Sequence, residues 1–313
     1  KEIGLEVSGV LSGEEMNAIN DEAFWNIVER TNLFVEVDPN QKERIISALQ
    51  KRNHVVGYMG DGINDAPSLH NADVGISVDQ AVDVAKEAAD FVLLKHDLNV
   101  LKQGIVLGRK TFANTMKYVN VTNSANFGNM FSMAGISILI PFLPLLPYQV
   151  LLTNFLTDIP GIMIADDDVD AELIQNPHRW DIRSLRQFML VFGLTSSLFD
   201  YFTFFILLTL LNSTQVVFRT GWFIQSVLTE LMAMLILRSR KPFFRSKIGR
   251  GLLYSTIGIG IATVLLPYIP YFANLLGLQP LPWQLILTLF GITLLYTIVN
   301  EIAKKYFYKN NHG

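Results

Sequence analysis

The sequence predicts a partial α/β domain with a parallel sheet, followed by an all-α transmembrane bundle of six helices. Residues 1–110 alternate charged and apolar segments, as the strands and helices of an α/β domain do. Beyond about residue 118 the charges thin out and long apolar runs begin. Half of the 313 residues are hydrophobic and only 17% are charged, which is more apolar than is usual for a soluble chain. We therefore predict two domains, at residues 1–110 and 111–313.

Six apolar runs predict the membrane-spanning helices, because a helix needs about 20 mostly apolar residues to cross a bilayer. The predicted spans are 119–140, 148–165, 188–211, 222–237, 252–272 and 283–302. Lys and Arg are frequent in alternate loops, including residues 238–250 and the segment after residue 302. Cytoplasmic loops carry this excess of positive charge. The pattern predicts a multi-pass protein with its N-terminal domain and its C-terminus in the cytoplasm.

Composition narrows the chemistry of the chain. It contains no cysteine, which excludes disulfides, thiolate metal sites and cysteine nucleophiles within these residues. The formal net charge of −3 gives no indication of a nucleic-acid partner. Residues 1–7 do not resemble a signal peptide and read as the middle of a domain, so we predict that the chain is a fragment.

The first domain is predicted to alternate strands and helices. Asp38 is a natural N-cap and Pro39 suits a first helical turn, which predicts a helix to about residue 51. Ligands of parallel, doubly wound sheets bind beyond the carboxyl ends of the strands. The loop at residues 60–67 follows a predicted strand in this way. The other predicted elements are strands at 33–37, 54–59, 74–78 and 91–94 and a helix at 81–89.

The loop at residues 60–67, Gly-Asp-Gly-Ile-Asn-Asp-Ala-Pro, carries the first candidate site. Asp61 and Asp65 are four residues apart and Asn64 lies between them, a set of oxygen donors that suits Mg²⁺ bound together with a phosphate. Gly60 and Gly62 let the backbone approach a phosphoryl group. An acidic surface turn is the alternative, since Asp, Gly and Asn also favour turns.

This octapeptide resembles the hinge motif of the P-type ATPases, members of the haloacid-dehalogenase-like superfamily. The resemblance implies a haloacid-dehalogenase-like (Rossmann-like) partial phosphorylation domain. It also implies that Asp61 and Asp65 hold the catalytic Mg²⁺ and that Asn64 helps to bind phosphate. Residues 39–42 resemble the Pro-x-x-Lys segment of the family, in which Lys42 would pair with a phosphorylated aspartate. Met59 departs from the pattern, because many members have Thr there.

The resemblance implies an aspartyl-phosphate intermediate, which is covalent catalysis. The family forms it on an Asp-Lys-Thr-Gly-Thr motif, and this string does not occur in the chain. The N-terminal remainder of the same protein is expected to supply this motif, the ATP-binding domain and the first four membrane helices. The six predicted spans would then be helices five to ten of the family, and the chain alone is expected not to hydrolyse ATP.

Two predicted membrane helices carry polar residues that could bind a cation. Residues 97–140 read as one long helix that rises from the soluble domain and would couple it to the membrane. Asn126 and Asn129 share a face of this helix. Intramembrane amides tend to face a helix bundle or a cavity. They can also act as contacts between helices, worth about 1 kcal/mol each.

The second polar segment is Thr-Asn-Phe-Leu-Thr-Asp-Ile-Pro-Gly at residues 153–161. A mid-span carboxylate such as Asp158 is costly unless it is paired or bound to a metal ion. Pro160 and Gly161 can unwind the helix and free carbonyl oxygens where they line a cavity. The string resembles the Asn-x-x-Thr-Asp cation motif of the sixth helix of P-type pumps. The resemblance implies that Asn154, Thr157 and Asp158 are cation ligands or support them.

Other acidic residues are weaker candidates. Glu230 lies in the middle of a predicted span and is a candidate additional ligand. Asp200 and Glu301 are expected to be structural or interfacial. The acidic run at residues 166–170 could collect cations or could be a solvated loop.

The amide-rich donor set favours Mg²⁺ over Ca²⁺, because Ca²⁺ prefers several carboxylates whereas Mg²⁺ keeps part of its water shell. Residues 119–130 and 152–160 most resemble the bacterial magnesium-importing P-type ATPases. That resemblance covers essentially the whole chain. It implies ATP-driven import of Mg²⁺ across a bacterial inner membrane, with Mg²⁺ and ATP as cofactors and lipids around the helices. A calcium or monovalent-cation pump is the first alternative.

Two alternatives come from other classes. A membrane-anchored phosphatase would use the loop at 60–67 and would not need the intramembrane polar groups. A secondary transporter would use the intramembrane polar groups and would not need the loop. A pump uses both.

Overall fold

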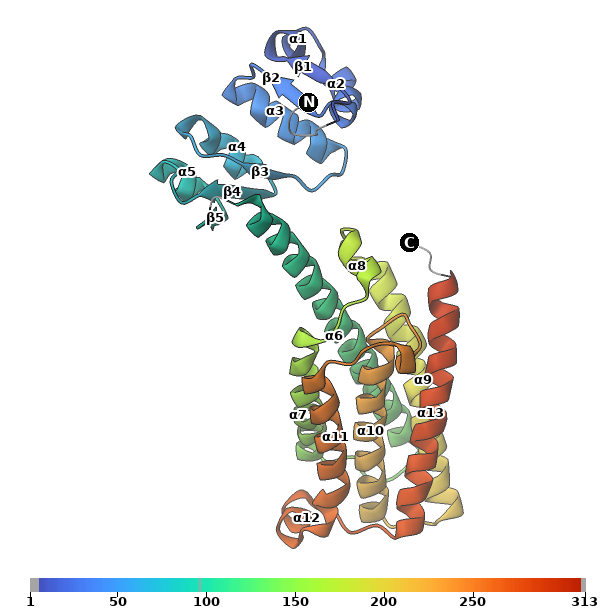
Figure 1. Cartoon of the computed structure of the whole chain (residues 1–313). Helices are drawn as coiled ribbons and strands as arrows, with labels where there is room; N and C mark the ends of the chain where they lie inside the picture. The colour runs from blue at the N-terminus through green and yellow to red at the C-terminus, as the bar shows by residue number, and fades with distance from the viewer. Residues whose placement is uncertain (1–5, 96, 311–313) are drawn as a thin grey trace. The chain divides into compact units, whose positions relative to one another are not determined.

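A computed structural model describes residues 6–95 and 97–310 of the chain (Figure 1). Residues 1–5, which contributed to the prediction that the chain begins within a domain, lie outside the described residues. The chain divides into two compact units, Lys1–Ile105 and Val106–Gly313. Each unit has a hydrophobic core of its own.

The first unit contains two small parallel sheets with short helices. β1 and β2 form one sheet, and β3, β4 and β5 form the other in that order. The elements are β1 (Val10–Ser12), α1 (Gly13–Asn17), α2 (Asp21–Ile27), a 3₁₀ turn (Val28–Arg30), β2 (Leu33–Val35), α3 (Pro39–Lys51), β3 (Gly57–Met59), a 3₁₀ turn (Ile63–Asp65), α4 (Ala66–Asn71), β4 (Val74–Val78), α5 (Asp83–Ala88) and β5 (Phe91–Leu93).

The helix predicted at residues 39–51 is confirmed as α3. The carboxylate of Asp38 accepts from the backbone N–H of Gln41, whose side chain accepts in turn from the N–H of Asp38. This reciprocal capping satisfies two N–H groups that the first turn would otherwise leave unpaired. Met16, Phe24 and Val28 pack beneath this part of the chain as a small core.

The prediction of a haloacid-dehalogenase-like, doubly wound sheet is wrong for the structure observed. Four of the five strands have only three residues, and they belong to two separate sheets instead of one. The strand predicted at residues 54–59 is formed only from Gly57 to Met59, and it pairs with β4 and not with β2. Each sheet covers its own small core, and Leu69, Ala81 and Ala85 form the core beside β3 and β4.

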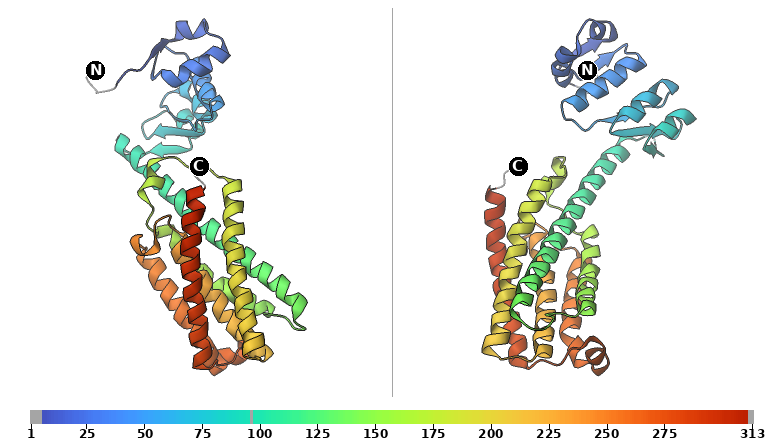
Figure 2. Two further views of the ribbon diagram at one scale, coloured as in Figure 1. Left: turned by 90° about the vertical axis from the view of Figure 1, so that its right-hand side faces the viewer. Right: turned by 180° about the vertical axis from the view of Figure 1, so that it is seen from behind.

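The second unit is a bundle of helices that run beside one another (Figure 2). The core lies around α10, of which almost every residue is buried. α10 packs against α7, α9, α11 and α13. The helices are α6 (Leu98–Leu139), α7 (Pro147–Met163), α8 (Ala171–Gln175), α9 (Ile182–Phe205), α10 (Gln215–Leu237), α11 (Arg250–Leu265), α12 (Pro270–Leu276) and α13 (Trp283–Asn310).

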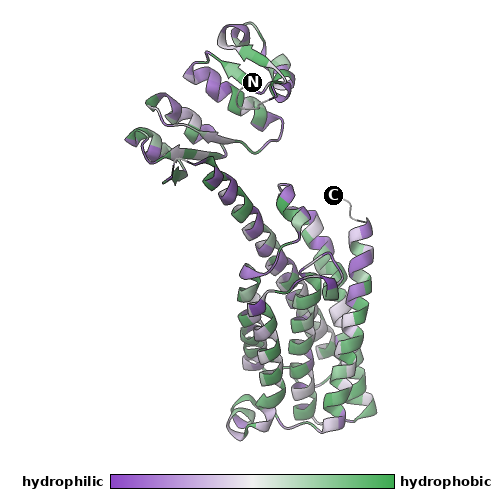
Figure 3. Cartoon of the chain, viewed as in Figure 1, coloured by the Kyte–Doolittle hydropathy of each residue, from purple (hydrophilic) through white to green (hydrophobic). Residues whose placement is uncertain are grey.

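The prediction of a six-helix transmembrane bundle is also wrong. Among the described residues, four helical segments are long and apolar enough to cross a membrane: Ile182–Leu210, Gln215–Leu237, Arg250–Tyr268 and Trp283–Lys309. α7 has only 17 residues, fewer than the roughly 20 that a span requires. α6 is long, but its repeated asparagines make it less apolar, and its first turns are clearly hydrophilic (Figure 3).

α6 and α9 approach each other closely where both carry glycine. A Cβ on Gly128 would lie 2.9 Å from the carbonyl oxygen of Gly193. The hydroxyl of Ser197 on α9 donates to the carbonyl of Gly128 at 3.0 Å. Small residues allow such backbone contact between helices. This contact places the polar face of α6 against the interior of the bundle.

Candidate functional site

The loop at residues 60–67 begins at the carboxyl end of β3 and leads into α4. The backbone N–H of Gly60 donates to Ile76 of β4, and the hydroxyl of Ser77 donates to the carbonyl of Gly60. The N–H of Val82 donates to the carbonyl of Asp61. The neighbouring strand and the segment before α5 therefore hold the backbone of the loop in place.

Asp65 is the buried centre of the loop, with only 8% of its surface exposed. Its Oδ1 accepts from Lys42 Nζ at 2.7 Å and from the Tyr58 hydroxyl at 2.6 Å. Its Oδ2 accepts from the backbone N–H of Gly62 at 3.1 Å. The loop thus brings together Asp65 and Lys42, which the sequence reasoning had placed in one site. Asp61 and Asn64 are exposed beside them.

The charges of this group stabilise one another. Partial burial alone would raise the pKa of Asp65, but the hydrogen bonds from Lys42, Tyr58 and Gly62 outweigh it and lower the pKa below the usual value. The hydrogen bond to Asp65 raises the pKa of Lys42. Burial and the bond to Asp65 raise the pKa of Tyr58 to about 12. At neutral pH the site therefore holds a carboxylate, an ammonium group and a neutral phenol.

The donor set is compatible with Mg²⁺. The described residues contain no cluster of three or more His, Cys, Asp or Glu side chains suited to a metal ion. Mg²⁺, however, is commonly bound by one or two carboxylates together with phosphate oxygens and water. Asp61 and Asn64 point oxygen-bearing side chains to the surface, and Asp65 lies next to them. Lys42 competes for Asp65, because it already forms an ion pair with its Oδ1.

Gly60 is required by the close approach of Asp65. A Cβ at Gly60 would lie 2.5 Å from the Cβ of Asp65, whereas at Gly57 the nearest atom would be 3.9 Å away. We expect Gly60→Ala to destabilise the loop by about 1–3 kcal/mol, since the clash is with a side chain fixed by three hydrogen bonds. Hydrogen–deuterium exchange over residues 57–78 should increase. The matched control Gly57→Ala should leave it nearly unchanged, and equal exchange in both variants would contradict the expectation.

The second group of candidate residues lies in the helical unit, around Glu230 on α10. Glu230 is 5% exposed, and its Oε2 has no hydrogen-bond partner among the described residues. The hydroxyl of Thr157 on α7 is within hydrogen-bonding reach of its carboxylate, and the charge of Asp158 acts on it as well. A buried carboxylate oxygen without a partner is costly, and its cost is removed when a cation binds.

The candidate ligands on α7 differ in how deeply they are buried near Glu230. Thr157 is buried, and its hydroxyl donates to the carbonyls of Thr153 and Asn154 at 3.1 and 3.2 Å, which leaves its lone pairs free to accept or to bind a cation. Asp158 is exposed within this chain although its charge acts on Glu230, and Asn154 is half-buried. α7 stays helical through Pro160 to Met163, so the unwinding that Pro160 and Gly161 could allow does not occur. Packing of α7 against α10 and α11 keeps it helical.

The two asparagines of α6 have different surroundings. Asn129 accepts from the hydroxyl of Ser226 on α10 at 3.1 Å, four residues before Glu230. Asn126 is exposed. The structure therefore brings Asn129, Thr157, Asp158 and Glu230 toward the interface of α6, α7 and α10, while Asn126 lies on the outside of these residues.

The comparison with known proteins gives the family of the chain. The sequence profile described as "Cation transporting ATPase, C-terminus" matches residues 142–306, more than half of the chain. The chain belongs to this family. It is 41% identical to the magnesium-transporting ATPase, P-type 1, of Escherichia coli K12 over 317 aligned residues. The same identity holds for the protein of that name from Salmonella typhimurium 14028s.

Both alignments cover 100% of this chain but 35% of each relative, so the chain spans about a third of the length of these transporters. The similarity supports a membrane protein of the P-type ATPase class, in agreement with the four apolar helices. The resemblance to P-type cation pumps that the motifs predicted is confirmed.

Sequence reasoning missed a buried ionic cluster in this cation-transporting ATPase chain. Asp167 follows α7 and accepts from Lys117 Nζ of α6 at 2.8 Å, from Arg238 at 2.8 and 2.9 Å, and from the N–H of Gly249 at 2.9 Å. Asn114 of α6 donates to the carbonyls of Ala165 and Asp167. Asp167 is therefore not part of a solvated loop. The charge of Arg238 directly after an apolar helix was the available signal.

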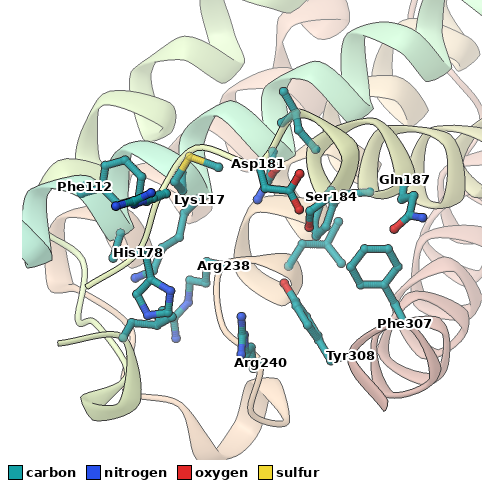
Figure 4. A pocket seen from close by; sticks show the side chains of 18 of the residues that line it. Phe112, Lys117, His178, Asp181, Ser184, Gln187, Arg238, Arg240, Phe307 and Tyr308 are labelled. Atoms are coloured by element: carbon teal, nitrogen blue, oxygen red, sulfur yellow. The ribbon is translucent and has the colours of Figure 1, made fainter. Parts of the chain in front are cut away.

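A cavity of about 620 Å³ lies next to this cluster (Figure 4). Lys117 and Arg238 line it, but both are already paired with Asp167. The phenol of Tyr308 and the ring of Phe307 face the opposite side of the cavity. Arg179, Arg183 and Arg240 add further positive charge to the lining, against the one carboxylate of Asp181. Because like charges repel, this cavity does not suit a transported cation.

Proposed function

We propose that this chain is part of an ATP-driven P-type pump that transports a cation, most specifically Mg²⁺, into the cell. The observation that carries the proposal is the unpartnered Oε2 of Glu230, buried in the bundle beside Thr157 and Asp158. The relatives named for magnesium transport support Mg²⁺ as the cargo. In the same proposal, the loop at residues 60–67 belongs to the phosphotransfer site.

The cation would bind between α6, α7 and α10. Glu230 and Asp158 would supply negative charge, and Asn129, Asn154 and Thr157 would supply neutral oxygens. A few carboxylates with several neutral donors suit an ion that keeps part of its water shell. Asp158 and Asn126 are exposed within this chain, which supports the proposal that the N-terminal remainder of the protein completes the site on that side.

The phosphotransfer site would use residues of the first unit. Bound Mg²⁺ would neutralise charge on the phosphoryl group. Asp61 and Asp65 would hold it, Asn64 would donate to a phosphate oxygen, and Gly60 and Gly62 would leave room for the phosphate. Lys42 would exchange part of its contact with Asp65 for the phosphorylated aspartate, which comes from the Asp-Lys-Thr-Gly-Thr motif in the remainder of the protein, as does the ATP site.

The proposed location is a bacterial inner membrane, with the first unit and the C-terminus in the cytoplasm. The Lys and Arg residues between α10 and α11, in the first turns of α9 and at the C-terminal end of α13 support this orientation.

The test is growth of bacteria that lack their own Mg²⁺ uptake systems, rescued by the full-length protein at low external Mg²⁺. We expect the parent to restore growth and Asp158→Ala to fail at equal expression, because the variant loses one of two carboxylates of the site. Asp166→Ala is the matched control, since it removes an exposed carboxylate eight residues away and should still rescue. Growth with Asp158→Ala as good as the parent would refute the site. A well-expressed parent that does not rescue would refute Mg²⁺ import and direct attention to Ca²⁺ or monovalent cations.

A further inference from the structure

Asp200 is a carboxylate enclosed by helices of the second unit. It lies on α9 and is 2% exposed. The hydroxyl of Ser132 on α6 donates to its Oδ2 at 2.7 Å, and Nε1 of Trp222 on α10 donates to its Oδ1 at 3.1 Å. Each oxygen therefore has one neutral partner. Of the two expected positions, structural or interfacial, this burial fits the structural one for Asp200.

No cationic side chain compensates its charge. Among the residues that the structure describes, Asp200 forms no ion pair with Lys, Arg or His. Asp200 interacts electrostatically with two other ionisable groups, Tyr201 on α9 and Tyr296 on α13. Tyr296 also interacts electrostatically with Glu230. An ionised carboxylate in such surroundings is expensive without a positive partner. The negative charge of Asp200 is therefore compensated by either a bound proton or a bound metal ion.

The partners of Asp200 favour a proton. The indole N–H of Trp222 can only donate, so its positive end always points at Oδ1 and would repel a metal ion there. Mg²⁺ needs about six oxygen ligands, and Ser132 is the one side-chain oxygen hydrogen-bonded to Asp200 among the described residues. The hydroxyl of Ser132 can accept as well as donate. A proton on Oδ2 would therefore only reverse the 2.7 Å hydrogen bond.

We propose that Asp200 binds a proton inside the helix bundle and that this protonation is coupled to occupancy of the cation site around Glu230. The coupling rests on the proposed function, whereas the proton site does not. Protonation adds one H⁺ from the solvent to Oδ2, so that Asp200 donates to Ser132 Oγ and the Ser132 O–H turns away from Asp200. The new O–H bond of Asp200 is the one covalent bond that forms, and none breaks in the protein.

The coupling follows from two helix faces that both sites share. On α6, Ser132 lies three residues after Asn129. On α10, Trp222, Ser226 and Glu230 follow one another at intervals of four residues. Ser226 donates to Asn129 at 3.1 Å, between the two sites. At a rise of 1.5 Å per residue, Trp222 and Glu230 are about 12 Å apart along α10. A change of charge at Asp200 alters the bonds that hold these faces of α6 and α10 together.

Infrared spectroscopy of the full-length protein in lipid nanodiscs tests the proton site directly. A protonated carboxyl group gives a C=O stretching band that disappears on ionisation. In a pH titration without divalent cation, we expect a band that Asp200→Asn removes and Asp200→Glu restores at a shifted frequency. Glu301→Gln is the matched control, because Glu301 pairs with Lys304 at 3.0 Å and should not contribute. A band unchanged in Asp200→Asn would overturn the proton site.

A second measurement tests the coupling. Because linkage is reciprocal, Mg²⁺ that changes the midpoint of the Asp200 band must show an apparent affinity that depends on pH. We expect the Mg²⁺ affinity of the parent to change at least about threefold between pH 6 and 8, and that of Asp200→Asn to stay constant. Equal pH dependence in both proteins would overturn the coupling. A parent that transports no Mg²⁺ refutes the proposed function, and the titration without cation still decides the proton site.

Discussion

Asp167→Ala should lower the free energy of unfolding by about 3–5 kcal/mol, the cost of removing one partner from a buried ionic group. The substitution leaves Lys117 and Arg238 with uncompensated charges, and their side chains are 6% and 0% exposed. It also removes the acceptor of the Gly249 N–H at the start of α11. Thermal unfolding of the purified protein in detergent or nanodiscs measures the effect.

Asp166→Ala is the control for this experiment, because it deletes the neighbouring carboxylate from an exposed position. Its midpoint should stay close to that of the parent. Burial alone would raise the pKa of Asp167, but bonds from Lys117, Gly249 and Arg238 lower it overall. A lowered pKa means that the stabilisation is complete above the unfolded value of about 3.9 and is lost only as the pH falls through the lower folded value. The difference between the variants should therefore persist down to about pH 4. Equal midpoints at neutral pH would contradict the role of Asp167.

Glu230→Gln in the full-length protein should weaken the apparent affinity for the transported cation by at least about tenfold, or abolish transport, because it replaces a buried charged ligand by a neutral one. The side chains are nearly equal in size, so packing around α10 should be preserved. The readout is growth rescue as a function of external Mg²⁺ concentration in bacteria that lack their own uptake systems, because the Mg²⁺ bound to ATP inside the cell is then unaffected.

Glu172→Gln provides the comparison, since Glu172 lies on the exposed helix α8 and touches neither group of site residues. It should give the concentration dependence of the parent. A normal Mg²⁺ dependence in Glu230→Gln, with normal expression, would show that the unpartnered oxygen of Glu230 serves another purpose. The cation site would then have to be built from Thr157 and Asp158 without Glu230.

The candidate sites could be predicted to different extents. The spacing of Asp61 and Asp65 after a predicted strand indicated the loop, but its conformation is held by bonds to Ile76, Ser77 and Val82 that the spacing does not show. Lys42 could be placed with that loop only by resemblance, and the structure pairs it with Asp65 at 2.7 Å. Glu230 was a weaker candidate, since one carboxylate in an apolar run does not indicate which neighbouring helix it faces.

The sequence by itself determined the local features: the capped helix at residues 39–51, the loop after β3, the apolar character of α9, α10, α11 and α13, and membership of the cation-transporting ATPase family. These depend on contacts between near neighbours and on composition. Tertiary structure alone decided that the short strands form two sheets, that α6 and α7 differ from the four apolar spans, and that Asp167 and Asp200 are buried. Burial and partner choice depend on residues about 50 to 80 positions away, such as Lys117 and Gly249 for Asp167, and only packing of the helices brings them together.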